Sequence, residues 1–176
     1  MDNMPRFYRY VGPKDILKRT AGDPRGLRVI SMPELAEWVR SSGLTPNRED
    51  LIALTFVVDS EGFLRVADRF SEHVACAGGD PVLSAGEMFI RLTEEELLVQ
   101  EISNQSTGYC PEPESWPAVA AALEGIGLVP PGRFTHEMIF RRCPTCRERN
   151  LVKDRWFVCG VCDSILPDHW NFDEEK

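Results

Sequence analysis

The chain has 176 residues, 43% of them hydrophobic, and a formal net charge of −8 at pH 7. This length and apolar content suffice for one folded core with a small appendage, and they exclude a disordered chain or two full domains. The negative charge excludes general nucleic-acid binding, because phosphates would be repelled from most of the surface. No stretch approaches the roughly 20 apolar residues of a membrane helix, and no apolar run follows the N-terminus. We therefore expect a cytoplasmic protein with no membrane partner.

The first fifty residues are predicted to be mainly helical. Pro13 suits the first turn of a short helix. A clearer helix begins at Ser31, because Ser31 and Glu34 have the spacing of a capping box, and Gly43 ends it.

After residue 50 the pattern changes to β-branched and apolar runs typical of strands. Four segments are predicted as strands: 54–58, 63–66, 81–92 and 97–102. Asp59–Gly62 suits the turn of a hairpin between the first two. We expect a second hairpin across the acidic turn Glu94–Glu96. Thr93 and Glu96 can instead cap a helix over 97–102, and both alternatives stay open.

The most regular helix is predicted over 115–126, with Ser115 as its N-cap and Gly127 after its last turn. Its apolar residues form one stripe that would pack on the sheet. A strand over 138–140 then leads into the cysteine-rich C-terminus.

Together these elements predict an α+β fold with a mainly antiparallel sheet and one packed helix. We divide the chain into an α+β domain over 1–138 and a C-terminal module over 139–176 packed on it. Within the first domain, 1–50 is helical and 51–138 is β-rich.

Four of the six cysteines stand in two Cys-x-x-Cys pairs near the C-terminus. Cys143 and Cys146 form the first pair, and Cys159 and Cys162 follow after twelve residues. In a reducing cytosol such pairs indicate metal ligands rather than disulfides. Four thiolates complete the tetrahedral shell of one Zn²⁺ and leave no position for a substrate water, so we expect one structural zinc ion. A rubredoxin-like iron site and a redox dithiol remain alternatives.

With these cysteines, the segment 140–172 resembles the zinc-ribbon family, in which one hairpin joins two such knuckles. Glycine commonly follows the second cysteine of each knuckle. Here Arg147 and Asp163 take those places, so left-handed backbone at either residue would be strained.

Basic residues surround the first pair and the segment that follows it. They are Arg141, Arg142, Arg147, Arg149, Lys153 and Arg155. One interpretation is a docking face for an acidic partner or a nucleic acid. The other is that these cations offset the charge of about −2 on a zinc ion bound by four thiolates.

The segment from Asp68 to Glu114 combines glycines with polar side chains beside predicted strands, where binding sites concentrate. Five of its residues are candidates for a pocket or a catalytic site: His73, Glu87, Asn104, Ser106 and Tyr109. His73 can act as acid, base or hydrogen-bond donor. The alternative is that these side chains satisfy turns and loop backbone within the fold.

Known catalytic patterns find little support in this segment. Cys76 or Cys110 could pair with His73 as a thiol nucleophile, although nothing in the spacing fixes their geometry. The chain contains no phosphate-binding loop, no His-Glu-x-x-His run and no zinc-deaminase signature.

The stretch 101–111 resembles poorly characterised domains of bacterial toxins and effectors with a Ser-Gly-His-Tyr-x-Pro signature. Those domains also have an upstream histidine, matched by His73, and an Ala-Gly-Glu strand, matched by residues 85–87. This chain departs from the signature by having Thr107 and Gly108 where Gly-His is usual. The resemblance implies a bacterial conflict or defence context.

His73 followed by Tyr109 is also similar to the histidine and tyrosine that hold NAD in ADP-ribosyltransferases. The glutamate that such enzymes need would have to be Glu137.

From these observations we expect a zinc-binding bacterial adaptor or accessory module that recognises a protein partner or small ligand. A small enzyme, for example one catalysing NAD-dependent ADP-ribosyl transfer, is the first alternative. Nucleic-acid binding through the basic face of the ribbon is the second.

Overall fold

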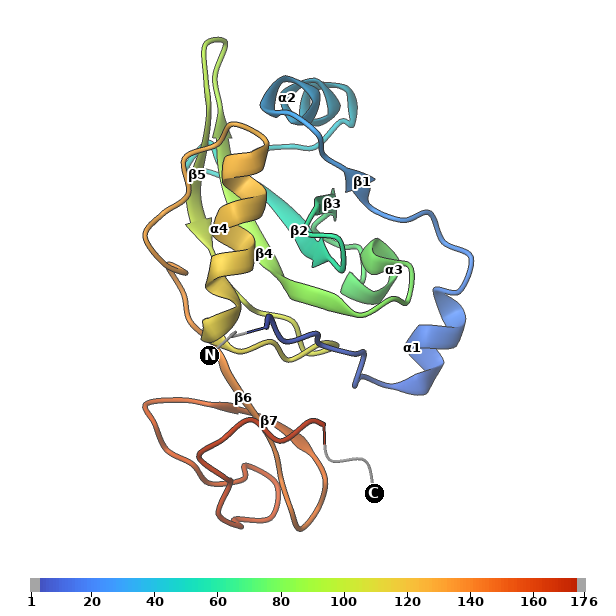
Figure 1. Cartoon of the computed structure of the whole chain (residues 1–176), viewed down its shortest axis with the longest axis vertical. Coiled ribbons are helices and arrows are strands. Elements are labelled where there is room, and N and C mark those ends of the chain that lie inside the picture. The colour runs from blue at the N-terminus through green and yellow to red at the C-terminus, as the bar shows by residue number, and fades with distance from the viewer. Residues whose placement is uncertain (1–3, 174–176) are drawn as a thin grey trace.

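The computed structural model describes residues 4–173 and shows a mixed helix and strand architecture (Figure 1). The elements in chain order are α1 (Lys14–Arg19), β1 (Leu27–Arg28), α2 (Met32–Ser41), β2 (Ile52–Asp59), β3 (Leu64–Asp68), α3 (His73–Ala77), β4 (Val82–Leu92), β5 (Leu97–Ile102), a 3₁₀ turn η1 (Pro113–Ser115), α4 (Trp116–Gly125), β6 (Ile139–Arg142) and β7 (Arg149–Val152). The predicted α+β class is confirmed. No helix within residues 4–173 is long and apolar enough to cross a bilayer.

One antiparallel sheet, in the order β1-β3-β2-β4-β5, forms the centre of the molecule. β2 is the middle strand, and its central residues are buried on both faces. This explains why β2 reads as a continuous apolar run rather than an alternating one. β6 and β7 form a separate two-stranded sheet in the C-terminal segment 139–172, which we call the ribbon.

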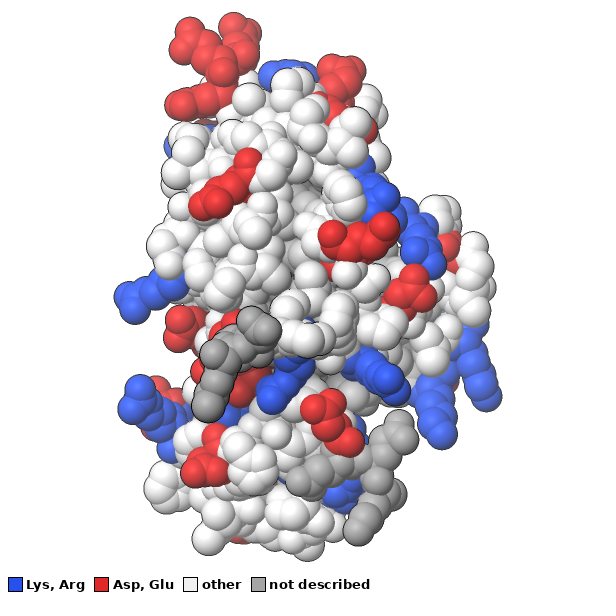
Figure 2. Space-filling view, in the orientation of Figure 1, with Lys and Arg blue, Asp and Glu red and all other residues white. Residues whose placement is uncertain are grey.

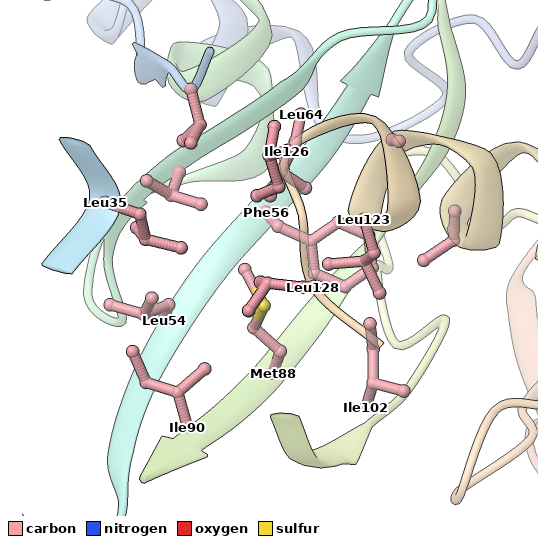
Figure 3. Packing of buried hydrophobic residues seen from close by; sticks show 14 of the residues in the cluster. Leu35, Leu54, Phe56, Leu64, Met88, Ile90, Ile102, Leu123, Ile126 and Leu128 are labelled. Carbon is pink, nitrogen blue, oxygen red and sulfur yellow. The ribbon is translucent and has the colours of Figure 1, made fainter. Parts of the chain in front are cut away.

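The main core lies between one face of the sheet and the helices α2 and α4 (Figure 3). Phe56 and Met88 contribute from the two central strands, Leu35 from α2 and Leu123 from α4, and all four are fully buried. Each such side chain contributes roughly 1.5–3 kcal/mol through the area it removes from water.

A second core lies on the opposite face of the sheet, where β2 contributes Val57. There the N-terminal segment and the end of the ribbon meet: the rings of Tyr8 and Trp170 are T-shaped with centroids 5.4 Å apart. The indole Nε1 of Trp170 donates to the carbonyl oxygen of Cys110 at 2.8 Å. The ribbon is therefore joined to the rest of the chain by buried contacts.

Residues 4–50 are less helical than predicted, because α1 and α2 are short and β1 lies between them. Pro13 is the extended N-cap residue of α1 rather than part of its first turn, whereas the capping box of α2 is confirmed. At α2, the Ser31 Oγ accepts from the Glu34 backbone N–H at 3.3 Å, and a Glu34 carboxylate oxygen accepts from the Ile30 N–H at 2.7 Å. Gly43 follows with a φ of +71°.

The open alternative over 97–102 is decided in favour of a strand, because these residues form β5 and pair with β4. Thr93 closes the hairpin rather than capping a helix. Its Oγ1 accepts from the Glu96 N–H at 3.0 Å, and its own N–H donates to the Glu96 carbonyl at 2.9 Å.

Ser115 stands at the predicted N-cap position of α4 but does not cap the helix. Ser115 has helical backbone angles (φ −75°, ψ −7°) and makes no cap hydrogen bond, because the 3₁₀ turn η1 precedes α4 and includes it. Its hydroxyl donates instead to the carbonyl of Glu112 at 2.7 Å and lies 2.8 Å from the Ser84 hydroxyl. β1 and α3 were not predicted, because a two-residue strand and a five-residue helix are too short to show a period.

Candidate functional site

The four predicted metal ligands converge at one end of the ribbon. The Sγ atoms of Cys143, Cys146, Cys159 and Cys162 all lie within 4.8 Å of one another. The pairs 143–162 and 146–159 are 3.5 and 3.6 Å apart. A tetrahedral zinc ion with Zn–S bonds of about 2.3 Å needs sulfur separations of about 3.8 Å, so the cysteines are positioned to bind one metal ion.

The backbone around the ligands has the form of two knuckles. Arg147 and Asp163 adopt left-handed φ angles of +67° and +59°, as their positions after the second cysteines suggested. The N–H groups of Cys146 and Val161 point at sulfurs, 3.5 Å from Cys143 Sγ and 3.4 Å from Cys159 Sγ. Such donors stabilise thiolate charge, which supports metal ligation at this site.

Side chains outside the knuckles also contact the sulfurs. The amide Nδ2 of Asn150 lies 3.5 Å from Cys159 Sγ, and Ser164 Oγ lies 3.3 Å from Cys162 Sγ. Cys143 and Cys159 are fully buried. With four sulfur ligands the shell is complete, so the site can hold structure together but offers no open position for substrate.

The basic residues of the ribbon have different surroundings. Arg141 is buried, donating to a Glu112 carboxylate oxygen at 2.7 Å and to the Asp168 carbonyl at 2.8 Å. Burial raises the pKa of Glu112, and the Arg141 guanidinium opposes that shift. Arg149 donates to the Thr107 carbonyl. Arg141 and Arg149 therefore fasten the ribbon to the loop between β5 and η1.

Two of the candidate catalytic residues lie beside Gly86 on β4. His73 begins α3, and its Nε2 lies 2.9 Å from the Gly86 carbonyl oxygen. Burial lowers the pKa of His73. Glu87 follows Gly86 in the strand and lines a small cavity of about 70 Å³ together with Glu101 and His136. His73 and Glu87 thus lie near each other, but only Glu87 reaches a cavity surface.

The other three candidates are buried in the loop between β5 and η1. Asn104 is fully buried: its Nδ2 donates to the carbonyls of Pro111 and Met138, both at 2.8 Å, and its Oδ1 accepts from the Met138 N–H at 2.7 Å. Ser106 Oγ accepts from the Tyr109 N–H at 3.3 Å. These side chains bond to the chain itself and keep the loop in place.

Tyr109 is fully buried, with its hydroxyl donating to the Asp80 carbonyl at 2.9 Å. Burial raises its pKa. None of the cavities of about 70, 670 and 1270 Å³ is lined by Tyr109, Asn104, Ser106 or His73.

The glycine of the Ala-Gly-Glu run stands where β4 has no room for a side chain. A Cβ at Gly86 would lie 1.8 Å from the carbonyl oxygen of Ser103 and 3.1 Å from the Cα of Asn104. The glycine therefore lets the loop cross directly over the strand.

The two remaining cysteines are buried, and burial raises the pKa of both Cys76 and Cys110 to about 12. At neutral pH they are thiols rather than thiolates, which opposes a role as nucleophile.

Two larger hollows lie wholly or mostly outside the polar segment from Asp68 to Glu114. One, of about 670 Å³, is lined by residues 19–27 and by the beginning of the polar segment at 68–75. The other, of about 1270 Å³, lies between residues 7–17 and the ribbon, and we call it the junction groove. Sequence reasoning missed the groove, because its walls come from opposite ends of the chain.

Comparison of the chain with protein-family models, with curated proteins and with solved structures found no match.

Proposed function

We propose that this protein is a binding module whose ribbon holds one structural zinc ion and which recognises a protein partner. The convergence of four cysteine sulfurs into a closed site carries the proposal. It is supported by the internal hydrogen bonds of Asn104 and Tyr109, which commit these polar groups to structure. The resemblance of residues 101–111 to bacterial conflict domains favours an accessory role in the cytoplasm of a bacterium.

The zinc part of the proposal is tested by the metal content of the purified chain. We expect one zinc per chain by elemental analysis, lost in a Cys143→Ser/Cys159→Ser variant. Cobalt substitution should give the charge-transfer absorption of a tetrahedral thiolate site. A stable iron centre with a rubredoxin-like spectrum would contradict zinc as the resident metal.

The rival enzyme hypothesis assigns a pocket to His73, Glu87, Asn104 and Tyr109. Asn104 and Tyr109 are buried and bonded internally, so its remaining support is the proximity of His73 and Glu87 at Gly86. It is tested by incubating the protein with NAD and other nucleotides and following hydrolysis or ADP-ribosyl transfer. We expect no turnover above that of a His73→Gln variant. Turnover that His73→Gln abolishes, in a variant whose folding is unchanged by circular dichroism, would overturn the binding-module proposal.

A further inference from the structure

The junction groove is the largest of the three hollows described above, at about 1270 Å³. Its volume exceeds the roughly 300–1,000 Å³ of pockets for drug-sized ligands. One wall is the N-terminal segment 7–17, and the other comes from the ribbon and the residues after it. Its size and open form suit a polymer segment rather than a small metabolite.

The groove is basic in a protein that is acidic overall. Arg9, Lys14, Arg142 and Arg147 line it, against the single carboxylate of Asp173. The whole chain has a net charge of −8, so these cations are concentrated rather than typical. Figure 2 shows blue side chains along α1, blue and red side chains at the boundary with the ribbon, and red side chains over the tip of the β4–β5 hairpin at the opposite end.

Arg142 lines the groove, and its backbone is held by Asn171. Its backbone N–H and carbonyl bond to the Asn171 side chain at 2.9 and 2.8 Å, and its guanidinium carbon lies 5.2 Å from the centre of the Phe172 ring. Its Nε is buried without a hydrogen-bond partner among residues 4–173.

Apolar surface accompanies the charge. The side chains of Phe7 and Leu17 line the groove and are 45% and 38% exposed. Exposed apolar side chains beside a basic surface favour a ligand that combines carboxylates with at least one large apolar side chain.

We propose that the junction groove binds an acidic peptide segment of a partner protein, with carboxylates on the arginines and an apolar side chain against Phe7 and Leu17. This rests on the proposed function and specifies its recognition surface. Guanidinium groups suit carboxylates because their planar fork can donate two parallel hydrogen bonds.

The surroundings of the aromatic rings favour a peptide over a nucleic acid. Single strands bind along several phosphates and stack successive bases on open aromatic faces. Here Trp170 and Phe172 are only 9% and 5% exposed, and the guanidinium groups of Arg6 and Arg142 lie over them. Of the other rings in the groove, Phe7 is exposed and Tyr10 is partly buried with its hydroxyl donating to the Pro13 carbonyl, and two such rings are too few for a stacking platform.

The test uses the full zinc-loaded chain and a fluorescent peptide in which glutamates alternate with leucines, followed by fluorescence anisotropy. Wild type should bind this peptide, with affinity that falls as salt rises. The variant Arg9→Glu/Lys14→Glu should weaken binding about tenfold or more, since two attractive charges become repulsive. Phe7→Ala should weaken it a few fold and leave the salt dependence unchanged.

The matched control is Lys153→Glu/Arg155→Glu, which changes the net charge equally but on exposed residues of the ribbon outside the groove. It should leave the affinity within about twofold, because Lys153 and Arg155 do not line the groove and salt screens exposed charges that make no direct contact. Equal weakening by both double variants, or no binding of the peptide by wild type, would overturn the proposal.

Two further probes identify a different occupant. Tighter binding of an oligothymidine than of the peptide, lost in Arg9→Glu/Lys14→Glu, would replace the peptide by a single-stranded nucleic acid. Self-association in sedimentation experiments, lost in the same variant and in Glu94→Gln/Glu95→Gln, would replace it by the hairpin tip of a second copy. Either result overturns the groove proposal but leaves the proposed structural zinc site standing, whereas His73-dependent turnover overturns the binding-module proposal and says nothing of the groove.

Discussion

The sheet-and-helix body and the ribbon are stabilised in different ways. The body buries a continuous apolar core between the sheet and the helices α2 and α4 (Figure 3). The buried core of the ribbon consists of Cys143, Val152, Cys159 and Leu166, so half of it is metal ligand. We expect hydrophobic burial to suffice for the body, and we expect the ribbon, with its small apolar core, to need a bound metal to offset the loss of chain entropy.

The two regions nevertheless meet in a shared interface. The end of the ribbon contributes Trp170 and Phe172 to the second core, where they pack with Tyr8. Arg141 and Glu112 form an ion pair at 2.7 Å across the same boundary. Loss of the metal should therefore loosen the ribbon first and weaken the attachment of the N-terminal segment second.

The largest expected effect is that of removing the metal. A chelator, or the Cys143→Ser/Cys159→Ser variant, should unfold the ribbon, because structural zinc contributes on the order of 10 kcal/mol in comparable small modules. Limited proteolysis should then cleave within 140–172, while the strands from β2 to β5 stay protected. Added zinc should restore protection to the wild type only. An apo ribbon with unchanged protease resistance would contradict the expectation that the ribbon depends on metal for its fold.

Truncating a side chain in the core of the body should destabilise the body and leave the metal site intact. Phe56 is fully buried, so Phe56→Ala should lower the free energy of unfolding by about 3–5 kcal/mol, measured by denaturant titration. Phe70, 86% exposed, is the matched control, and Phe70→Ala should cost less than about 0.5 kcal/mol. Zinc affinity should not change in either variant. Metal loss in Phe56→Ala would show that the two regions fold as one unit.

Asn104 bonds to Met138, which directly precedes the ribbon, so replacing Asn104 tests the boundary between the two regions. Asn104→Ala removes three hydrogen bonds and leaves the backbone groups of Pro111 and Met138 unsatisfied. We expect a loss of about 2–4 kcal/mol in thermal or chemical unfolding. The exposed neighbour Gln105 provides the control, since Gln105→Ala should be nearly neutral. A stable Asn104→Ala variant that had lost an activity would favour the enzyme hypothesis instead.

The smallest expected effect is on the pH dependence of the stability of the body. Burial lowers the pKa of His73 below its ordinary value of 6.5. The unfolded chain then binds a proton more readily than the folded one, so stability falls as pH drops below about 6.5 and is retained above it. Unfolding curves of His73→Gln should lose part of this acid-side decline, whereas those of the exposed His169→Gln should keep it. Identical pH profiles for wild type and His73→Gln would contradict the burial argument.

Much of the fold follows from local sequence signals. The capping box at Ser31, the turn at Asp59–Gly62 and the apolar run of β2 each specify their element through contacts a few residues apart. Ser115 shows the limit of such signals. Its residue type suits an N-cap, but the prolines around it extend the helix backwards through a 3₁₀ turn.

The sequence by itself identified the four cysteines whose sulfurs converge to positions suited to one metal ion, and the two residues beside them where left-handed backbone is strained, because the knuckle geometry depends on spacing within each short motif. It left open what the polar residues of the central segment do. Only the tertiary structure decided that Asn104 bonds to Met138, 34 residues away, and that Trp170 bonds to Cys110, 60 residues away. The junction groove also depends on the tertiary structure, because its two walls come from opposite ends of the chain and meet only through long-range packing.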